Sequence, residues 1–427
     1  MFFKKPFHCI IVMILWGFFI TAQATPEVLS LDEAIALALH THPTLTLQKE
    51  KTYELRFKVE ESWVDFFPQL ALEGGSSHFE NRDLRNVGIR LRYPLFEGGR
   101  VVYEYRKNEA QEKAGQARVQ ITEQKLILNV KRAYVNLLLE EELLKASQTE
   151  KDNLAKLFSI AEVLFSTGQV PQSDLIRIKT QLLESENRMI QEEKNRDVAH
   201  SVLLQLLSLD QTSDIKVSSD LSHVISERLS LEEALETAHI RRPEFKDFYY
   251  REKGIKSELN VEKSDYWPRI YLDGQYGGSN NPMGMRRDIG SFEEYWSIGI
   301  NIEVNFWNWG KARTRARQTE SRARQLRHEK NGFSNTLSFE VKEAYLLWKT
   351  AQKSLINAQE LLSSSTQAYE ILLEDYQTGK ASNEVILESQ NQLHQSQKNY
   401  ENSFFEVFNT EFNLEQMLGL LGEVSGR

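Results

Sequence analysis

Cysteine, proline and long apolar runs are all scarce in this chain of 427 residues. The one cysteine, Cys9, excludes both a disulfide bond within the chain and a metal centre held by several cysteines. The nine prolines leave long stretches such as 100–165 uninterrupted, so very long helices can form. No run of about 18 apolar residues occurs after residue 24, which argues against a transmembrane helix. Such a chain crosses a membrane only as a closed β-barrel, because lipid offers no partners to backbone polar groups.

The chain also lacks an excess of positive charge and the common sequence motifs of enzymes. The 52 basic residues are outnumbered by 61 acidic ones, and the net charge of −9 argues against nucleic acid as a partner. The nine histidines are scattered, and HExxH, GxSxG and a phosphate-binding glycine loop are absent. His40 and His42, two residues apart at a helix end, suit capping or solvation better than a shared ligand. We therefore expect no catalytic residue, no cofactor and no metal site.

The N-terminus is typical of a secretory signal peptide. Lys4 and Lys5 precede an apolar run over 10–20, and Ala22-Gln23-Ala24 supplies the small residues of a cleavage site. We expect residues 1–24 to be removed, which takes Cys9 with them. Without a cysteine at the cleavage point, no lipid anchor is expected.

The chain repeats itself. Residues 29–45 (LSLDEAIALALHTHPTL) return 200 positions later as 229–245 (LSLEEALETAHIRRPEF), and the offset becomes 211 further along. An insertion of 11 residues between Gly274 and Gly299 accounts for the change. A repeat of this size indicates one structural unit used twice, and we expect repeats at 25–228 and 229–427 after the signal peptide.

The sequence pattern of each repeat predicts a short helix, a medium helix, two strands and two long helices. The first copy has its short helix at 31–40, and the stretches 100–165 and 311–376 are each 66 residues long. The remaining helices are expected at four ranges whose lengths sum to 64 residues in each copy: 43–67 with 171–209, and 243–267 with 382–420. Two helices stacked end to end would therefore match one long helix, and apolar spacings of three and four favour coiled-coil packing in a tall tube.

Two strand pairs are predicted at about 68–96 and 268–306, with exposed loops at 77–86 and 278–294. Apolar and polar residues alternate along these segments in the pattern of membrane strands. The expected lipid-facing residues are Ile89, Leu91, Tyr93, Ile298, Ile300, Ile302 and Val304. Four strands cannot close a barrel, since the smallest transmembrane barrels have about eight, so a membrane-spanning form must be an oligomer.

These residues resemble the outer-membrane efflux protein family of TolC-like channel-tunnels. The resemblance is carried over about 29–422 by the paired start motifs, by Pro-Leu-Phe-Glu-Gly-Gly-Arg at 94–100, and by the motifs at 165–168 and 376–379. It implies an α+β membrane protein. In this fold a homotrimer closes a 12-stranded β-barrel in the outer membrane, and long antiparallel helices form a periplasmic α-barrel.

The resemblance also implies a function. The protein would be the passive exit duct of a tripartite efflux or type I secretion system, working with a periplasmic adaptor protein and an inner-membrane pump of RND or ABC type. The cargo, whether small toxic compounds, a secreted protein or metal ions, stays open. The alternatives are a periplasmic structural coiled-coil protein without a pore and, in third place, a secreted hydrolase.

Several residues match functional positions of the family. Gly168 and Gly379 fall at the helix turns where the adaptor docks. Glu384 and Glu388 lie on one helical face, and tripled they would form a ring that favours cations. The family has two aspartates three residues apart here; Glu388 matches the second, whereas Val385 occupies the first position. Tyr376 and Asp174 match residues that hold the tip closed through a hydrogen bond.

A basic stretch opens the second long helix. It could suggest contact with nucleic acid, but secretion favours a solvated helix start, with some side chains extending toward lipid headgroups. Its members are Lys311, Arg313, Arg315, Arg317, Arg322, Arg324 and Arg327.

Overall fold

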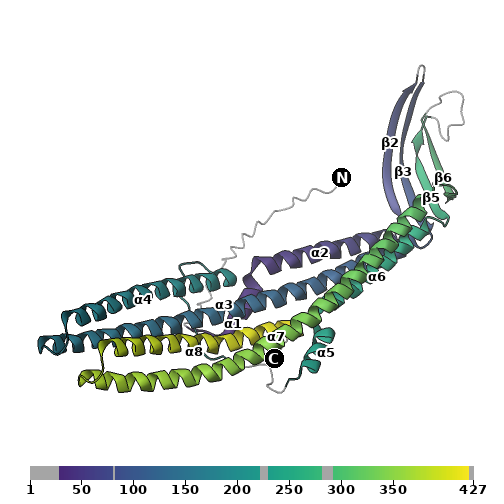
Figure 1. Ribbon diagram of the computed structural model, residues 1–427. Coiled ribbons are helices and arrows are strands. Elements are labelled where there is room, and N and C mark those ends of the chain that lie inside the picture. Colours follow the sequence, from purple (N-terminus) through teal and green to yellow (C-terminus); the bar gives the residue numbers. More distant parts are fainter. Residues whose placement is uncertain (1–27, 80–81, 222–228, 281–291, 423–427) are drawn as a thin grey trace, which may run out of the picture.

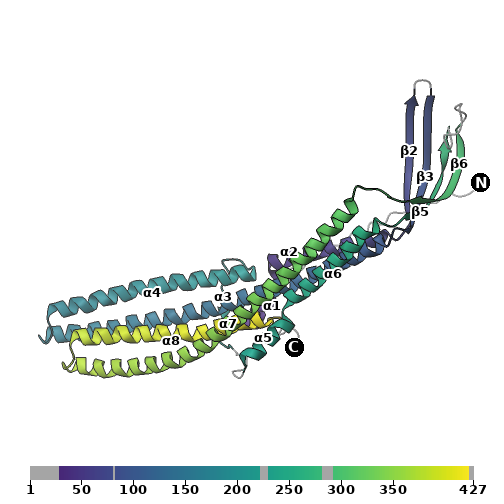
Figure 2. The ribbon, with the colours of Figure 1, turned by 45° about the vertical axis from the view of Figure 1, so that its right-hand side comes forward.

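The computed structural model describes residues 28–79, 82–221, 229–280 and 292–422. A long bundle of helices carries a small upright sheet at one end (Figures 1 and 2). The expected signal peptide, with Cys9, lies outside the described residues.

The two halves of the chain present the same elements in the same order. The first half contains α1 (Leu31–Thr41), α2 (Pro43–Val64), β2 (Gln69–Phe79), β3 (Arg82–Phe96), α3 (Arg100–Ser166) and α4 (Gln172–Leu207). The second half contains α5 (Leu231–Arg241), α6 (Pro243–Ser264), β5 (Arg269–Ser279), β6 (Glu293–Glu303), α7 (Lys311–Gln377) and α8 (Asn383–Leu418). Corresponding helices are equal in length, at 11, 22, 67 and 36 residues.

Helix ends follow from local chemistry that recurs at equivalent positions. Ser30 and Glu33 form a capping box at α1, and Ser230 and Glu233 form the same box at α5. Each long helix begins after a glycine with positive φ, at Gly99 and Gly310. The helices expected at 100–165 and 311–376 are confirmed to within one residue at each end. Those expected at 171–209 and 382–420 are confirmed to within two residues.

Two sequence predictions about segment ends were wrong. The medium helices end three residues early, at Val64 and Ser264, because turns form ahead of the prolines at 68 and 268. The expected loops are partly strand, since β2 and β3 pair up to Phe79 and Arg82, and β5 and β6 up to Ser279 and Glu293. The 11 extra residues of the second copy thus fall between Ser279 and Glu293.

The sheet is antiparallel in the order β2-β3-β5-β6, so β2 and β6 are its edges. Val304, expected in a strand, lies one residue beyond β6. The last pair is Arg269 with Glu303, and the preceding Pro268 has no N–H to extend the ladder. β1 (Val28–Leu29) and β4 (Lys216–Val217) form a separate parallel pair beside α3.

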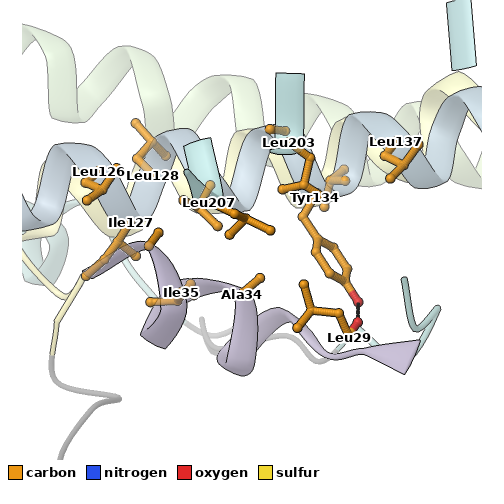
Figure 3. Packing of buried hydrophobic residues seen from close by; sticks show 14 of the residues in the cluster. Leu29, Ala34, Ile35, Leu126, Ile127, Leu128, Tyr134, Leu137, Leu203 and Leu207 are labelled. Atoms are coloured by element: carbon orange, nitrogen blue, oxygen red, sulfur yellow. Dashed lines mark hydrogen bonds between the residues drawn. The ribbon is translucent and has the colours of Figure 1, made fainter. Parts of the chain in front are cut away.

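The apolar core is distributed along the bundle rather than gathered in one globule. A central cluster surrounds Tyr134, whose side chain points toward Leu29 of β1 (Figure 3). A second cluster surrounds Trp348 where α5 meets α7 and α8, and a third lies near the helix turns and includes Tyr369. Within the described residues, no helix combines the length and the apolar character needed to cross a membrane.

Candidate functional site

The sheet has one apolar face that stays exposed among the described residues. The register places Leu72 opposite Ile89, which pairs in turn with Tyr276, and Leu272 opposite Ile300. Leu72 is 79% exposed and Ile298 is 67% exposed. The expected lipid-facing residues Ile89, Leu91, Tyr93, Ile298, Ile300 and Ile302 all share this face. An apolar patch of this extent marks a surface for lipid or for a partner.

The opposite face of the sheet is polar and crossed by ion pairs. Arg90 contacts Glu73 at 2.7 Å, and Arg92 contacts Asp273 at 2.9 Å. Asn301 donates a hydrogen bond to the same Asp273 carboxylate at 2.5 Å. Two faces of such different character suit a sheet between an apolar environment and water.

Both helix turns at the far end of the bundle are closed by glycine (Figure 1). Gly168 has φ +75° and Gly379 has φ +74°, a left-handed conformation that disfavours residues with a Cβ. Each turn also has a hydrogen bond from the following residue, Gln169 to Leu164 and Lys380 to Asp375, as in a Schellman motif. Apart from its chain neighbours, no atom of the described residues lies within 4 Å of a Cβ built at Gly168, so this turn is open to a partner.

Glu384 and Glu388 are both exposed at the start of α8, one helical turn apart, with Val385 exposed between them. No ion pair involving either carboxylate is found in the described part of the chain. Two free carboxylates on one face are available to a cation or to water.

The expected hydrogen bond between Tyr376 and Asp174 is absent. The Tyr376 hydroxyl is buried and has no partner among the described residues. Burial raises the pKa of this phenol, and the charge of Asp174 adds to the shift. Asp174 instead accepts a hydrogen bond through its backbone oxygen, from the Asn383 side chain at 3.5 Å. The two residues thus lie near each other without the predicted contact.

A buried polar cluster joins three helices and was not predicted from the sequence. Glu150 of α3 is 1% exposed and accepts two hydrogen bonds from Arg188 of α4, at 2.7 and 3.1 Å. His394 of α8 lies 3.4 Å from the same carboxylate. Nearby, Lys398 of α8 contacts Glu192 of α4 at 2.8 Å. The partners are far apart in the chain, so the sequence offered only one sign of this cluster, the charged Glu150 at a core-facing position of its helix.

His42 caps a helix as expected, whereas the basic stretch is partly paired with α6 rather than fully solvated. The Nδ1 atom of His42 accepts a hydrogen bond from the Thr44 N–H and caps α2. In the basic stretch, Arg322 pairs with Glu258 of α6 at 2.6 Å and Arg315 lies near Glu262. Among the described residues, no group of three or more His, Cys, Asp or Glu side chains could hold a metal ion.

Comparison with known proteins identifies relatives. Residues 34–208 and 234–420 match the family described as "Outer membrane efflux protein". Outer membrane protein TolC of Vibrio cholerae serotype O1 is 20% identical over 357 residues, covering 80% of this chain and 78% of that one.

Solved structures share the fold. CusC matches with a TM-score of 0.79 at 19% identity, covering 91% of this chain and 92% of that chain. VceC of Vibrio cholerae, described as an outer membrane protein, matches with a TM-score of 0.77 at 14% identity, covering 91% and 96%.

Proposed function

The chain belongs to the outer membrane efflux protein family, and we propose that it works, as a homotrimer, as the outer-membrane exit duct of an efflux or type I secretion system. The family is one of channels rather than enzymes. The observation that supports the duct best is the four-stranded sheet with one bare apolar face, one charged face and two free edges. The two repeats, 25–228 and 229–427, and cleavage of the signal peptide near Ala24 without a lipid anchor are part of this proposal.

Three copies of the sheet would give a 12-stranded barrel in outer-membrane lipid. The apolar face would then contact lipid, and the polar face would line water. Pairing β6 of one copy with β2 of the next removes both free edges, whose unpaired backbone groups lipid could not satisfy.

The helices support the same closure. α3 contacts α4 and α8, and α8 contacts α7, so α4 and α7 form the outer edges of this part of the protomer. On α4, Ile176, Leu183 and Ile190 recur every seven residues, and all three are exposed. A heptad stripe of this kind is a seam that lacks its partner helix, and α7 of a neighbouring copy would supply it.

The tip would form the gate and the docking site. Glu384 and Glu388, tripled around the axis, would form an acidic constriction that favours cations. Tyr376 and Asp174 would hold the neighbouring coils together at the tip through packing rather than through the hydrogen bond first expected. The turns at Gly168 and Gly379 would meet a periplasmic adaptor, through which an inner-membrane pump of RND or ABC type delivers cargo.

Conductance in a planar bilayer tests the duct. Purified protein should give discrete steps that favour cations, and it should fractionate with the outer membrane as a heat-modifiable trimer. A Glu384→Gln/Glu388→Gln variant should shift the reversal potential toward zero in a salt gradient, whereas Glu236→Gln in α5 should leave it unchanged. A periplasmic coiled-coil protein without a pore would give no steps, and unchanged selectivity in the double variant would exclude these residues as the constriction.

Partner capture tests the docking site. A photo-crosslinker attached at Gly168→Cys or Gly379→Cys should trap the adaptor in cells. The same label at Ser77→Cys, on the polar face near the far end of the sheet, should not. Identifying the trapped adaptor would also identify the pump and the cargo class.

A further inference from the structure

One junction within the protomer joins the end of the first hairpin to the start of the second. Arg100, at the first position of α3, forms an ion pair with Asp265, which follows α6. Beside it, the Phe96 and Trp267 rings meet edge to face with centroids 6.4 Å apart. A partly buried charge pair flanked by an aromatic contact thus fixes how β3 leaves the sheet next to the start of β5.

The residues at the equivalent positions on the two free edges form no such junction among the described residues, because the two edges lie apart in the protomer. The offset of 211 places Lys311 at the position of Arg100 and Trp307 at that of Phe96. The offset of 200 places Asp65 at the position of Asp265 and Phe67 at that of Trp267. Trp307 is 67% exposed and Phe67 is 49% exposed. In the described residues, the side chains of Lys311 and Asp65 have no hydrogen bond or ion pair.

The surroundings of Asp65 call for a cation. Partial desolvation raises its pKa, and the negative charges of Glu61, Glu104 and Glu97 act in the same direction. Asp265, in contrast, is near Arg100, Arg269 and Arg315. The residues corresponding to Arg269 and Arg315 are Gln69 and Glu104. Of the three equivalent positions, only Lys311, the counterpart of Arg100, still carries a cation.

We propose that Lys311 of one copy forms an ion pair with Asp65 of the next copy, with Trp307 packed against Phe67 of that copy, so that the intersubunit junction repeats the junction inside the chain. This inference rests on the proposed homotrimer and goes beyond it, because it fixes the register of the interface. Opposite charges at Lys311 and Asp65 are complementary. Among the described residues, the rings of Trp307 and Phe67 each contact only a ring of their own segment, Trp309 and Trp63, and a large part of each stays exposed.

The same equivalence between the internal and the intersubunit junction predicts how the strands pair. β3 pairs with β5 with Asn86 opposite Ser279 and Tyr93 opposite Leu272. The two offsets convert these pairs into Ser297 opposite Phe79 and Val304 opposite Leu72 of the next copy. In this register Val304 falls on the same apolar face as Leu72 and gains the strand partner that β5 cannot give it. The apolar face therefore continues across the interface without a break.

One position departs from strict equivalence. Trp309 has φ 54° and occupies the position that corresponds to Gly98 in the first sequence repeat. A Cβ built at Gly98 would lie 2.7 Å from the Trp267 Cβ. The intersubunit junction must be wider here than the internal one, and Phe67, smaller than Trp267, provides part of the room. The long lysine side chain of Lys311 still spans to Asp65.

Cross-linking tests the inference directly, since no cysteine follows Cys9 in the sequence. An Asp65→Cys/Lys311→Cys variant treated with a short bismaleimide in isolated outer membranes should give covalent dimers and trimers on denaturing gels. Arg100→Cys/Asp265→Cys is the matched control and should link only within one chain. Wild-type protein should not react.

Charge reversal provides the second measurement. Asp65→Lys and Lys311→Asp should each lower the temperature at which trimers dissociate in detergent, and the double variant should recover most of that loss. Trimers that neither cross-link at this pair nor recover in the double variant would overturn the register but leave the duct intact. Wild-type protein that is monomeric in every detergent would instead overturn the proposed function.

Discussion

Tyr134 donates a hydrogen bond to the backbone oxygen of Leu29 at 2.8 Å, and it thereby ties the first residues of the described chain to the middle of a 67-residue helix. The same hydroxyl accepts a hydrogen bond from the Ser218 N–H at 2.8 Å. The second half of the chain repeats the contact, since Tyr345 donates to the backbone oxygen of Leu229 at 3.1 Å. Burial raises the pKa of Tyr134 to about 12, so the phenol stays a donor at any physiological pH.

Tyr134→Phe should lower the free energy of unfolding by about 0.5–1.5 kcal/mol, because it removes the hydrogen bonds of the hydroxyl and leaves the Leu29 oxygen and the Ser218 N–H only their mutual bond of 3.0 Å. Tyr345→Phe should cost less, because Tyr345 is only half-buried and makes one of these contacts. Thermal unfolding in detergent, followed by circular dichroism, measures both. Equal losses in the two variants would contradict the assigned difference.

Ser208 ends α4 with φ 56°, whereas Gly419 ends α8 at the equivalent position with φ 72°. A left-handed conformation costs a residue with a Cβ about 1 kcal/mol relative to glycine. Ser208→Gly should therefore raise the free energy of unfolding by about that amount. The control is Ser201→Gly, in the interior of the same helix, which should lower it by about 0.5–1 kcal/mol. Destabilisation by Ser208→Gly would argue that its side chain makes a contact worth more than the strain.

Much of this architecture could be predicted from local sequence. Proline-free stretches, the apolar spacing of helices and the alternation along strands are local patterns, and they predicted the helices and the sheet faces closely. Contacts between distant segments could not be predicted in this way. Glu150, Arg188 and His394 come from three helices, and neither their burial nor their proximity leaves a local pattern. The expected hydrogen bond between Tyr376 and Asp174 is not formed for the same reason, because its geometry depends on how two coils pack.

Lys131 of α3 and Glu415 of α8 form an ion pair of 2.5 Å with both side chains buried, and the ammonium lies 4.5 Å from the centre of the Phe412 ring. Burial raises the pKa of Glu415, and Lys131 opposes that shift. Lys131→Met should cost about 3–5 kcal/mol, because a buried carboxylate loses its counter-charge.

The double variant Lys131→Met/Glu415→Leu should recover most of that loss, since replacing a buried ion pair by apolar groups is often neutral or stabilising. Denaturant unfolding of the two single variants and the double variant gives the coupling energy between the residues. Strictly additive losses would show that the pair is not coupled.

Tyr376 carries a buried hydroxyl without a partner in the described part of the chain, and such a group costs free energy. Tyr376→Phe keeps the ring and removes the unpaired hydroxyl, so stability should stay the same or rise by up to about 1 kcal/mol. Single-channel conductance should also remain near the wild-type value. A marked increase in conductance would show that the hydroxyl closes the tip after all, through a contact made only in the trimer.

The cluster around His394 predicts a loss of stability in acid. Burial lowers the pKa of His394 below its ordinary value near 6.5, although Glu150 and Glu192 favour the protonated form; Lys398 and Arg188 add to the lowering. The folded protein therefore holds this histidine neutral, whereas the unfolded chain takes up a proton as the pH falls through 6.5. The stabilising contribution is complete above that pH and decreases by up to about 1.4 kcal/mol for each pH unit below it, until the folded-state pKa is reached.

His394→Gln should remove this part of the pH dependence while keeping a group that can donate a hydrogen bond to Glu150. Melting temperatures at pH 7.5 and 5.5 should differ less in His394→Gln than in the wild type. His239→Gln, at an exposed site in α5, should behave like the wild type. Among the described residues the buried Nδ1 of His394 has no hydrogen-bond partner, so a proton placed there would strain the contact between α8 and the α3–α4 pair. An identical acid response in His394→Gln and wild type would show that other groups control the loss.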